Sequence, residues 1–342
     1  MKNTNLTICD ATIHPGETAN LALPLPELYS CASFYMPIKV VHGKHAGPCI
    51  LIFSALKGDE LNGLEIINRL LDPDKLNNLH GTLILIPVLN VVSLVNHLKT
   101  LSQEINLEGC FPGKEHGTYG ERMAYVFTKE ILSKADYCIE LKSGSLNHDI
   151  LPQVYCDLND AKSKILAQHF AAPVITNALT KSSSLRKTTE RLNIPLLIYQ
   201  AGEAMRFNES AITLGLDGIY KVMHALNMLP NDTDDSSGGF KSIFSEDQDW
   251  VYSHLSGILK SDVELGQHIR KKQVLGMIND PFGAGKAEPI RAPSDGIVVG
   301  INRHPLIHEG QSIFKIASFL DNIRAETALE AWGETLIDDS TT

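Results

Sequence analysis

Two lysines and two glutamates follow strand-like apolar runs and have the chemistry of a charged site. Lys57 and Glu60 come after the apolar run Pro48–Ala55, and Glu140 and Lys142 stand at the end of a second short run. A lysine ammonium donates three hydrogen bonds and has no lone pair, whereas a carboxylate only accepts. Two alternatives follow: the four groups pair with one another in an ion network, or the two cations hold an anionic ligand.

The elements that would position these side chains alternate between strand and helix. Short apolar runs predict strands that are buried on both faces, and stretches with apolar residues three and four apart predict helices. The predicted strands are Pro48–Ala55, Leu83–Val88, Tyr137–Leu141 and Leu196–Tyr199, and the predicted helices are Leu61–Leu71, Glu121–Leu132, Ala161–Phe170 and Ser210–Leu226. This alternation predicts an α/β domain.

A polar stretch, NDTDDSSGG, separates this region from a C-terminal part with a different pattern. Beyond it the segments are short, strand-like and punctuated by glycine, which is typical of a small all-β module. We therefore expect a first domain at 1–230, a linker at 231–249, a small β-domain at 250–320 and a polar, frayed tail at 321–342.

Composition and charge exclude several classes of function. The chain has 30 Lys plus Arg against 40 Asp plus Glu, so it has no broad basic surface for nucleic acid or anionic lipid. Its apolar runs are shorter than the roughly 20 residues that span a membrane. The N-terminal segment lacks the pattern of a signal peptide, and six cysteines without a CxxC pair fit free thiols, so we expect a cytoplasmic protein. The oligomeric state stays open.

Two segments together resemble the succinylglutamate desuccinylase/aspartoacylase family of zinc-dependent deacylases. SALKGDELNGLEII, at Ser54–Ile67, is similar to the family's strand, His-Gly-Asp-Glu loop and helix. LGQHIRKKQVLGMINDPFG followed by APSDGIVVG is similar to the biotinyl- or lipoyl-type β-sandwich that many members carry. The resemblance implies a mixed sheet flanked by helices, as in the zinc carboxypeptidases, followed by a small all-β sandwich. In the family, a zinc-bound water attacks an N-acyl amino acid and a glutamate moves the proton.

Two of the family's three zinc-ligand positions are altered when the motifs are matched residue by residue. Lys57 stands at the first histidine and Lys142 at the second, while Glu60 is kept. Glu140 falls on the aspartate that precedes the second histidine. Because a protonated lysine has no lone pair, and one carboxylate does not hold zinc alone, we expect no bound zinc and no other cofactor.

The positions that bind substrate and move the proton are altered as well. Glu108 and Gly109 fall on the Asn-Arg pair that holds the substrate carboxylate, and Gln200 falls on the general base. An amide cannot take a proton from water. We therefore expect a pseudoenzyme, a binding or regulatory homologue with a small anionic ligand. The alternative is an active hydrolase with a rebuilt site.

Three further residues, Glu203, His116 and His148, are candidate replacements within such a rebuilt site. Glu203 lies three residues after the base position, so we expect it to point elsewhere. His116 and His148 carry the usual zinc donor, but both lie in polar segments and are expected to be exposed loop residues. The turn Ala292–Gly296 contains no lysine, so covalent attachment of a cofactor is not expected.

Overall fold

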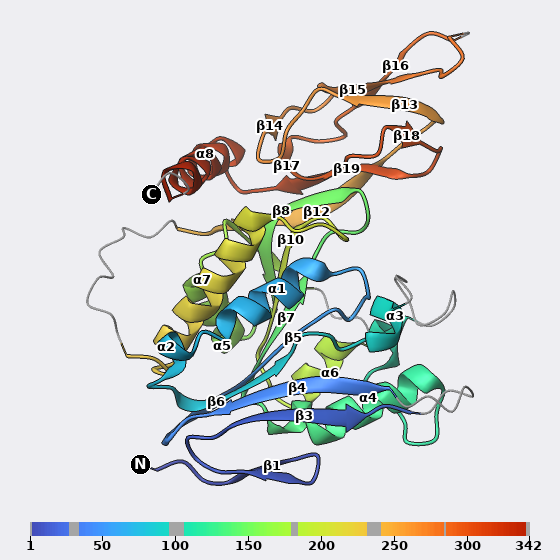
Figure 1. Ribbon diagram of the computed structural model, residues 1–342. Helices are drawn as coiled ribbons and strands as arrows, with labels where there is room; N and C mark the ends of the chain where they lie inside the picture. Colours follow the sequence, from blue (N-terminus) through green and yellow to red (C-terminus); the bar gives the residue numbers. More distant parts are fainter. Residues whose placement is uncertain are drawn as a thin grey trace.

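A large mixed sheet runs through the molecule (Figure 1). The computed structural model describes residues 2–26, 34–95, 106–178, 184–230, 241–283 and 285–339, and it describes side chains up to residue 332. Thirteen described strands form the large sheet: β3 (Thr18–Pro24), β4 (Tyr35–His42), β5 (His45–Ser54), β6 (His80–Ile86), β7 (Tyr137–Lys142), β8 (His148–Cys156), β9 (Val174–Asn177), β10 (Leu196–Gly202), β11 (Ile243–Ser245), β12 (Asp247–Tyr252), β14 (His268–Ile269), β17 (Gly296–Asn302) and β19 (Ser312–Ser318). The main order is β12-β19-β17-β8-β10-β7-β5-β6-β4-β3, with β9 beside β8, β11 beside β9 and β14 beside β17.

The centre of this sheet is parallel. Strands β6, β5, β7 and β10 run in the same direction, and their apolar residues are buried on both faces, as the continuous apolar runs require. The register sets Ser54 beside Leu141 and Gln200 beside Lys142. The loops that follow β5, β7 and β10 therefore meet at one edge of the sheet.

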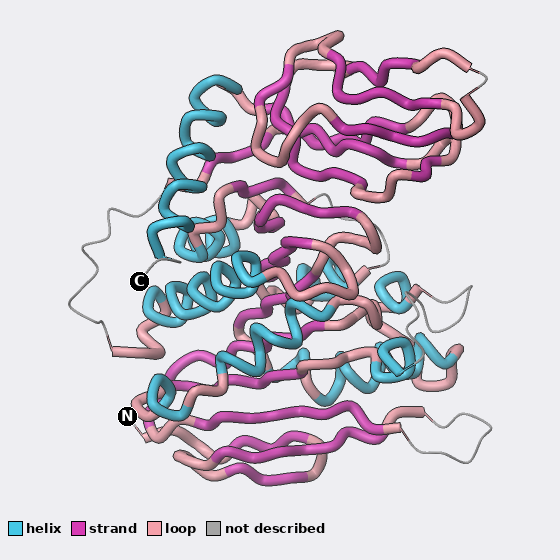
Figure 2. The backbone as a smooth tube through the Cα atoms, turned by 45° about the horizontal axis from the view of Figure 1, so that its top comes forward, coloured by secondary structure: helices cyan, strands magenta, loops and turns pink. Residues whose placement is uncertain are grey.

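Helices cover both faces of the sheet (Figure 2). On one face lie α1 (Leu61–Leu70), α2 (Pro73–Leu76), α5 (Ala161–Phe170) and α7 (Glu209–Ala225). On the other lie α4 (Tyr119–Glu130), α6 (Leu185–Arg191) and the hairpin of β1 (Leu6–Ile8) and β2 (Ala11–Ile13). Short α3 (Val91–Val95) and the 3₁₀ turns η1 (Leu107–Cys110) and η2 (Leu132–Lys134) complete the described elements of this part. The predicted α/β class with a mixed sheet is confirmed.

The C-terminal strands form a second layer. An antiparallel sheet of β16 (Glu288–Arg291), β15 (Val274–Asn279), β13 (Gly257–Ser261) and β18 (Leu306–Ile307) packs on β17 and β19 of the large sheet. Leu259, Leu275 and Phe314 are buried between the two layers. The predicted small all-β sandwich is therefore present, but β17 also pairs with β8, with Gly300 opposite Ile150. Hydrogen bonds of one sheet cross the expected division between 1–230 and 250–320, which stays a prediction.

Part of the expected linker is strand. Of the range 231–249, residues 231–240 lie outside the described residues. Strand β11 pairs in parallel with β9, with Ile243 opposite Val174, and β12 begins at Asp247. The linker prediction is wrong for these strands, because β9 offers a hydrogen-bonding edge that the local sequence does not reveal.

The expected frayed tail is also wrong. Helix α8 (Asn322–Asp339) follows β19, and only 340–342 lie outside the described residues. Ala325 and Leu329, one helical turn apart, are buried beside Leu151 and Ile297. Their apolar spacing gives the otherwise polar segment one face to bury.

Five of the six cysteines lie in the described residues, and all five are free thiols, as predicted. The sixth, Cys31, lies outside them. Within the described chain, no helix has the length and apolar character that crossing a membrane demands.

Candidate functional site

The loop after β5 carries the first half of the predicted site. Glu60 immediately precedes α1 and is fully buried, and its carboxylate accepts the backbone N–H of Lys57 at 3.1 Å. A Cβ at Gly58 would lie 2.1 Å from the backbone carbon of Ser93, so only glycine allows this loop to pack so closely. The loop therefore holds Glu60 rigidly beneath the surface while Lys57 stays half-buried.

Lys142, the last residue of β7, lies at the centre of an ion network. Its ammonium is 3.1 Å from a carboxylate oxygen of Glu140 and 3.5 Å from one of Glu108. Lys142 is 8% exposed and Glu140 2%, so both charges are removed from water. Lys142 and Glu140 lie two residues apart on β7 and form the expected ion pair, and η1 adds Glu108 as a second anion.

The charges of this network shift one another's pKa values. Burial alone would lower the pKa of Lys142, but the carboxylates of Glu140, Glu108 and Glu60 outweigh burial and raise it. The ammonium of Lys142 is the main cause that lowers the pKa of Glu108, against burial and with help from Lys57. Lys142 is therefore held in its charged form, in which it has no lone pair for a metal.

Glu60 behaves differently from the other carboxylates. Burial raises its pKa to about 7, although Lys142 and Lys57 pull the pKa down. Its carboxyl group therefore exchanges a proton near neutral pH.

Lys57 does not join the ion network. Within the described part of the chain, no carboxylate oxygen lies within 4.0 Å of its ammonium. Its only direct link to Glu60 is through the backbone N–H. Of the two alternatives that the sequence left open, the ion network describes Lys142, while the ammonium of Lys57 remains available to a ligand.

The two positions that the motif match assigns to the carboxylate clamp lie in a short 3₁₀ turn and carry no cation. Glu108 and Gly109 lie in η1, whose N-cap Asn106 accepts the backbone N–H of Glu108 at 3.1 Å. A Cβ at Gly109 would meet no atom within 4 Å. The position therefore has room for a side chain, whereas the neighbouring Glu108 has turned to Lys142.

Gln200 is held as a structural amide at the end of β10. Its side-chain N–H donates to the backbone oxygen of Ser143 at 3.0 Å. Glu203, the alternative base, accepts the backbone N–H of Asn147 at 2.9 Å and lies 3.6 Å from Arg206. Glu203 thus fixes the loop after β7, as expected of a residue that points elsewhere.

Asn62 joins the three loops of the site and was missed from the sequence. Its side chain donates to Ser143 Oγ at 3.3 Å and accepts the backbone N–H of Asn208 at 2.9 Å. It lies buried in the first turn of α1. A buried asparagine inside a helix that otherwise packs apolar side chains is the signal that could have identified it.

The two histidines have different environments. His116 is exposed in the turn before α4, as predicted. His148 is not a loop residue: it begins β8, lies 2.9 Å from Ser312 Oγ and packs edge-on against the Trp250 ring. The prediction of a loop residue is wrong because Ser312 of β19 and Trp250 of β12 pack against His148 at the start of β8. Neither histidine is joined to Glu60.

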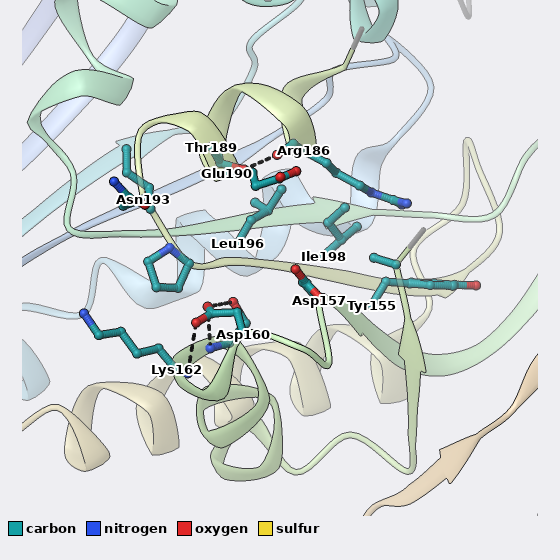
Figure 3. Close-up of a pocket in the computed structure, with 14 residues that line it drawn as sticks. Tyr155, Asp157, Asp160, Lys162, Arg186, Thr189, Glu190, Asn193, Leu196 and Ile198 are labelled. Atoms are coloured by element: carbon teal, nitrogen blue, oxygen red, sulfur yellow. Dashed lines mark hydrogen bonds between the residues drawn. The ribbon is translucent and has the colours of Figure 1, made fainter. Parts of the chain in front are cut away.

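A cavity of about 320 Å³ lies between α6, the amino end of β10 and the segment after β8 (Figure 3). Arg186, from α6, lines it together with Tyr155, from β8, and Asp157, and none of the residues of the ion network does. The charge of Arg186 contributes to lowering the pKa of Glu108, after Lys142 and Lys57. Arg186 could not be singled out from the sequence, because α6 is short and polar and was not predicted.

The residues at this site do not fit zinc. Two of the three matching positions hold lysines, and Lys142 is kept protonated by three carboxylates. No group of three or more His, Cys, Asp or Glu side chains with metal-binding geometry occurs among the described residues. Glu60 alone offers a conventional ligand at those positions.

Comparison with known proteins identifies relatives of this chain. Residues 46–226 match the catalytic-domain model of the succinylglutamate desuccinylase/aspartoacylase family. The N-alpha-acetyl-L-2,4-diaminobutyric acid deacetylase of Halomonas elongata is 23% identical over 307 residues, which cover 84% of this chain and 87% of the relative.

Solved structures share the fold. The product-bound ectoine utilization protein EutE (DoeB) from Ruegeria pomeroyi aligns with a TM-score of 0.78 and 21% identity, covering 88% of this chain and 95% of that one. A succinylglutamate desuccinylase/aspartoacylase from Rhodobacter sphaeroides aligns with a TM-score of 0.80 and 20% identity, covering 92% and 98%. Because the family model spans more than half of the sequence, the chain belongs to the succinylglutamate desuccinylase/aspartoacylase family.

Proposed function

We propose that this chain is a non-catalytic member of its deacylase family that binds a small anionic ligand at the former catalytic site. The observation that carries the proposal is the position of Lys142, a buried ammonium held by Glu140 and Glu108 where the family places a zinc ligand. The positive charge of Lys142 is balanced by these carboxylates, so it cannot polarise an acyl carbonyl as a metal ion does.

The other catalytic functions have no replacement that supports turnover. The side-chain N–H of Gln200 is committed to Ser143, and an amide has no proton-accepting capacity near neutral pH. Glu203 is committed to the backbone of Asn147. The losses affect the metal, the base and the substrate clamp together, and losses of groups that act as a unit are strongly non-additive.

The anionic character of the ligand follows from Lys57. Its half-buried ammonium has no carboxylate partner within 4.0 Å in the described residues and stands at the rim of the site. Arg186 lies near enough to Glu108 to contribute to lowering the pKa of that carboxyl, after Lys142 and Lys57, and so adds positive charge to the neighbourhood. An N-acyl amino acid, the substrate class of the family, carries the carboxylate that these cations would bind.

Glu60 favours a second candidate function, an active hydrolase with a rebuilt, metal-free site. Its pKa, raised to about 7 by burial, suits a group that accepts and returns a proton at neutral pH. This function requires Glu60 to reach a water beside the substrate, whereas its carboxylate accepts the backbone N–H of Lys57.

Metal content and turnover separate the two functions. We expect purified protein to contain no stoichiometric zinc and to release no acyl group from N-acetylaspartate, N-succinylglutamate or N-acetyl-2,4-diaminobutyrate. Turnover that is lost in Glu60→Ala would establish the rebuilt hydrolase instead. The double variant Lys57→His/Lys142→His should bind zinc, because Glu60 keeps its place; elemental analysis without zinc would show that the motif match is wrong.

Ligand binding is tested separately with non-hydrolysable dicarboxylates. Succinate should raise the melting temperature of the wild-type chain and should not raise that of Lys57→Met. The control is Lys260→Met, which removes an exposed lysine in β13. An equal response of Lys57→Met and the wild type would contradict binding at this site.

A further inference from the structure

A second concave site lies at the opposite edge of the parallel strands from Lys142. It is a cavity of about 490 Å³ at the amino ends of β5 and β6. The start of β3, the turn between β4 and β5, and the segment from α2 to β6 form its walls. The cavity shares no lining residue with the site at Lys142 or with the cavity beside Arg186.

The charged side chains of this cavity are all potential cations. Among the described residues, Lys39, Lys44, His42 and His45 line it, and no aspartate or glutamate does. In a chain with 40 acidic residues against 30 Lys plus Arg, a concave surface whose titratable side chains are all basic is a marked departure from the average. Among the described residues, no carboxylate oxygen lies within 4.0 Å of either lysine ammonium, since neither forms an ion pair.

The acidic residues that neighbour this lining along the chain, Glu17 and Asp72, do not line the cavity themselves. The carboxylate of Glu17 accepts the backbone N–H of His14 at 2.8 Å. The carboxylate of Asp72 accepts the backbone N–H of Asp74 at 3.0 Å as the N-cap of α2. Each carboxylate thus forms its hydrogen bond within its own turn, and neither pairs with Lys39 or Lys44.

The walls hold one of these lysines in place. The aliphatic chain of Lys44 lies against Gly16, where an added Cβ would be 2.9 Å from Lys44 Cγ. His42 forms the floor, since its two ring nitrogens are bound to Thr82 Oγ1 and to the backbone oxygen of Thr4, each at 2.8 Å. Lys39, Lys44 and His45 are therefore the basic groups left to contact a ligand.

We propose that this cavity binds the phosphate groups of a small phosphorylated molecule. Lysine ammoniums act on phosphate as compact point charges, and the exposed amides of Asn77 and Asn78 add donors at the rim. The volume exceeds what inorganic phosphate fills, and Val41 and Leu71 offer apolar contacts to an organic group. The two lysines, Lys39 and Lys44, suit a ligand with two adjacent phosphates.

Calorimetric titration of the full chain with inorganic pyrophosphate and with ADP tests this proposal. Both should bind, and Lys39→Gln/Lys44→Gln should weaken binding by about tenfold or more for each lysine removed, since each contributes charge-assisted hydrogen bonds. ADP binding more tightly than pyrophosphate would show that the apolar wall contacts the nucleoside. Equal affinities would show that the phosphates alone are bound.

The matched control is Lys260→Gln/Lys271→Gln, which removes the same charge from exposed positions of the C-terminal strands and turns. Equal weakening by both double variants, or no binding to the wild type, would overturn the proposal. Lys57→Met should leave pyrophosphate binding unchanged. If Lys57→Met abolishes it, the anion occupies the former catalytic site, so this proposal fails while the proposed function stands.

Discussion

Lys142, at a position that the resemblance matches to a metal ligand of the family, is the centre of a buried ion network. A buried ammonium persists only when anions surround it, and Glu140 and Glu108 provide these at 3.1 and 3.5 Å. At Lys57 the same change of residue type has a different result, because the side chain is half-buried and has no carboxylate within 4.0 Å in the described chain. The same substitution thus has a structural role at one position and leaves a free cation at the other.

Removing the buried cation should destabilise the protein. Lys142→Met leaves Glu140, which is 2% exposed, without its partner, and breaking one side of a buried ion pair costs about 3–5 kcal/mol. Urea unfolding followed by circular dichroism measures the loss. The matched variant Lys57→Met should lose no more than about 1 kcal/mol. Equal losses in the two variants would contradict the division of roles between the lysines.

Helix α8 shows how an apolar stripe anchors a polar segment. Leu329 is 5% exposed and packs with Leu151 and Ile297 of the large sheet. We expect Leu329→Ala to lower the free energy of unfolding by about 2–5 kcal/mol, as for other buried leucines. The control Ile323→Ala, at a position that is 66% exposed, should change it by about 0.5 kcal/mol or less. A Leu329→Ala variant as stable as the wild type would indicate a frayed tail after all.

Strand β19 contributes a lysine whose charge is poorly accommodated. Lys315 donates to the Tyr155 hydroxyl at 2.8 Å, and burial lowers its pKa to about 8, with Asp249 opposing the shift. Between pH 8 and about 10.4, the pKa of an unperturbed lysine, the unfolded chain binds more protons than the folded one, so this group adds stability as the pH rises.

A substitution at β19 therefore has a pH signature. The stability difference between the wild type and Lys315→Met should shift in favour of the wild type as the pH rises from 7.5 to about 9.5, the range over which Lys315 loses its proton before an unfolded lysine does. Urea midpoints at several pH values measure this. A difference that is independent of pH would mean that Lys315 keeps an ordinary pKa.

At the scale of the whole molecule, one sheet joins the catalytic-type region to the C-terminal strands. Strand β17 pairs with β8 and β11 with β9. A fragment of residues 1–240 would expose the edges of β8 and β9, and unpaired edges favour association. We expect this fragment to aggregate on size-exclusion chromatography. A monomeric fragment with a cooperative thermal transition would instead support two independently folding domains.

Local patterns in the sequence predicted the central parallel strands, the longer helices and the motif positions. The runs at 48–55 and 137–141 became β5 and β7 because continuous apolar segments suit strands covered on both faces. The differences from the family's motifs could be recognised in the sequence, because Lys57, Lys142 and Gln200 each change the chemical type at a motif position. Glu60 could be assigned to the site on the same ground.

The tertiary structure alone decided which charges pair and which segments share a sheet. Lys142 meets Glu108 because the chain folds η1 over the end of β7, and no local pattern specifies that contact. Arg186 reaches the same neighbourhood from α6, which has little apolar periodicity to reveal it. Strand β17 pairs with β8 because the free backbone edge of β8 can hydrogen-bond with a strand that packs beside it. Local sequence sets which elements form, whereas burial between distant segments sets which side chains meet.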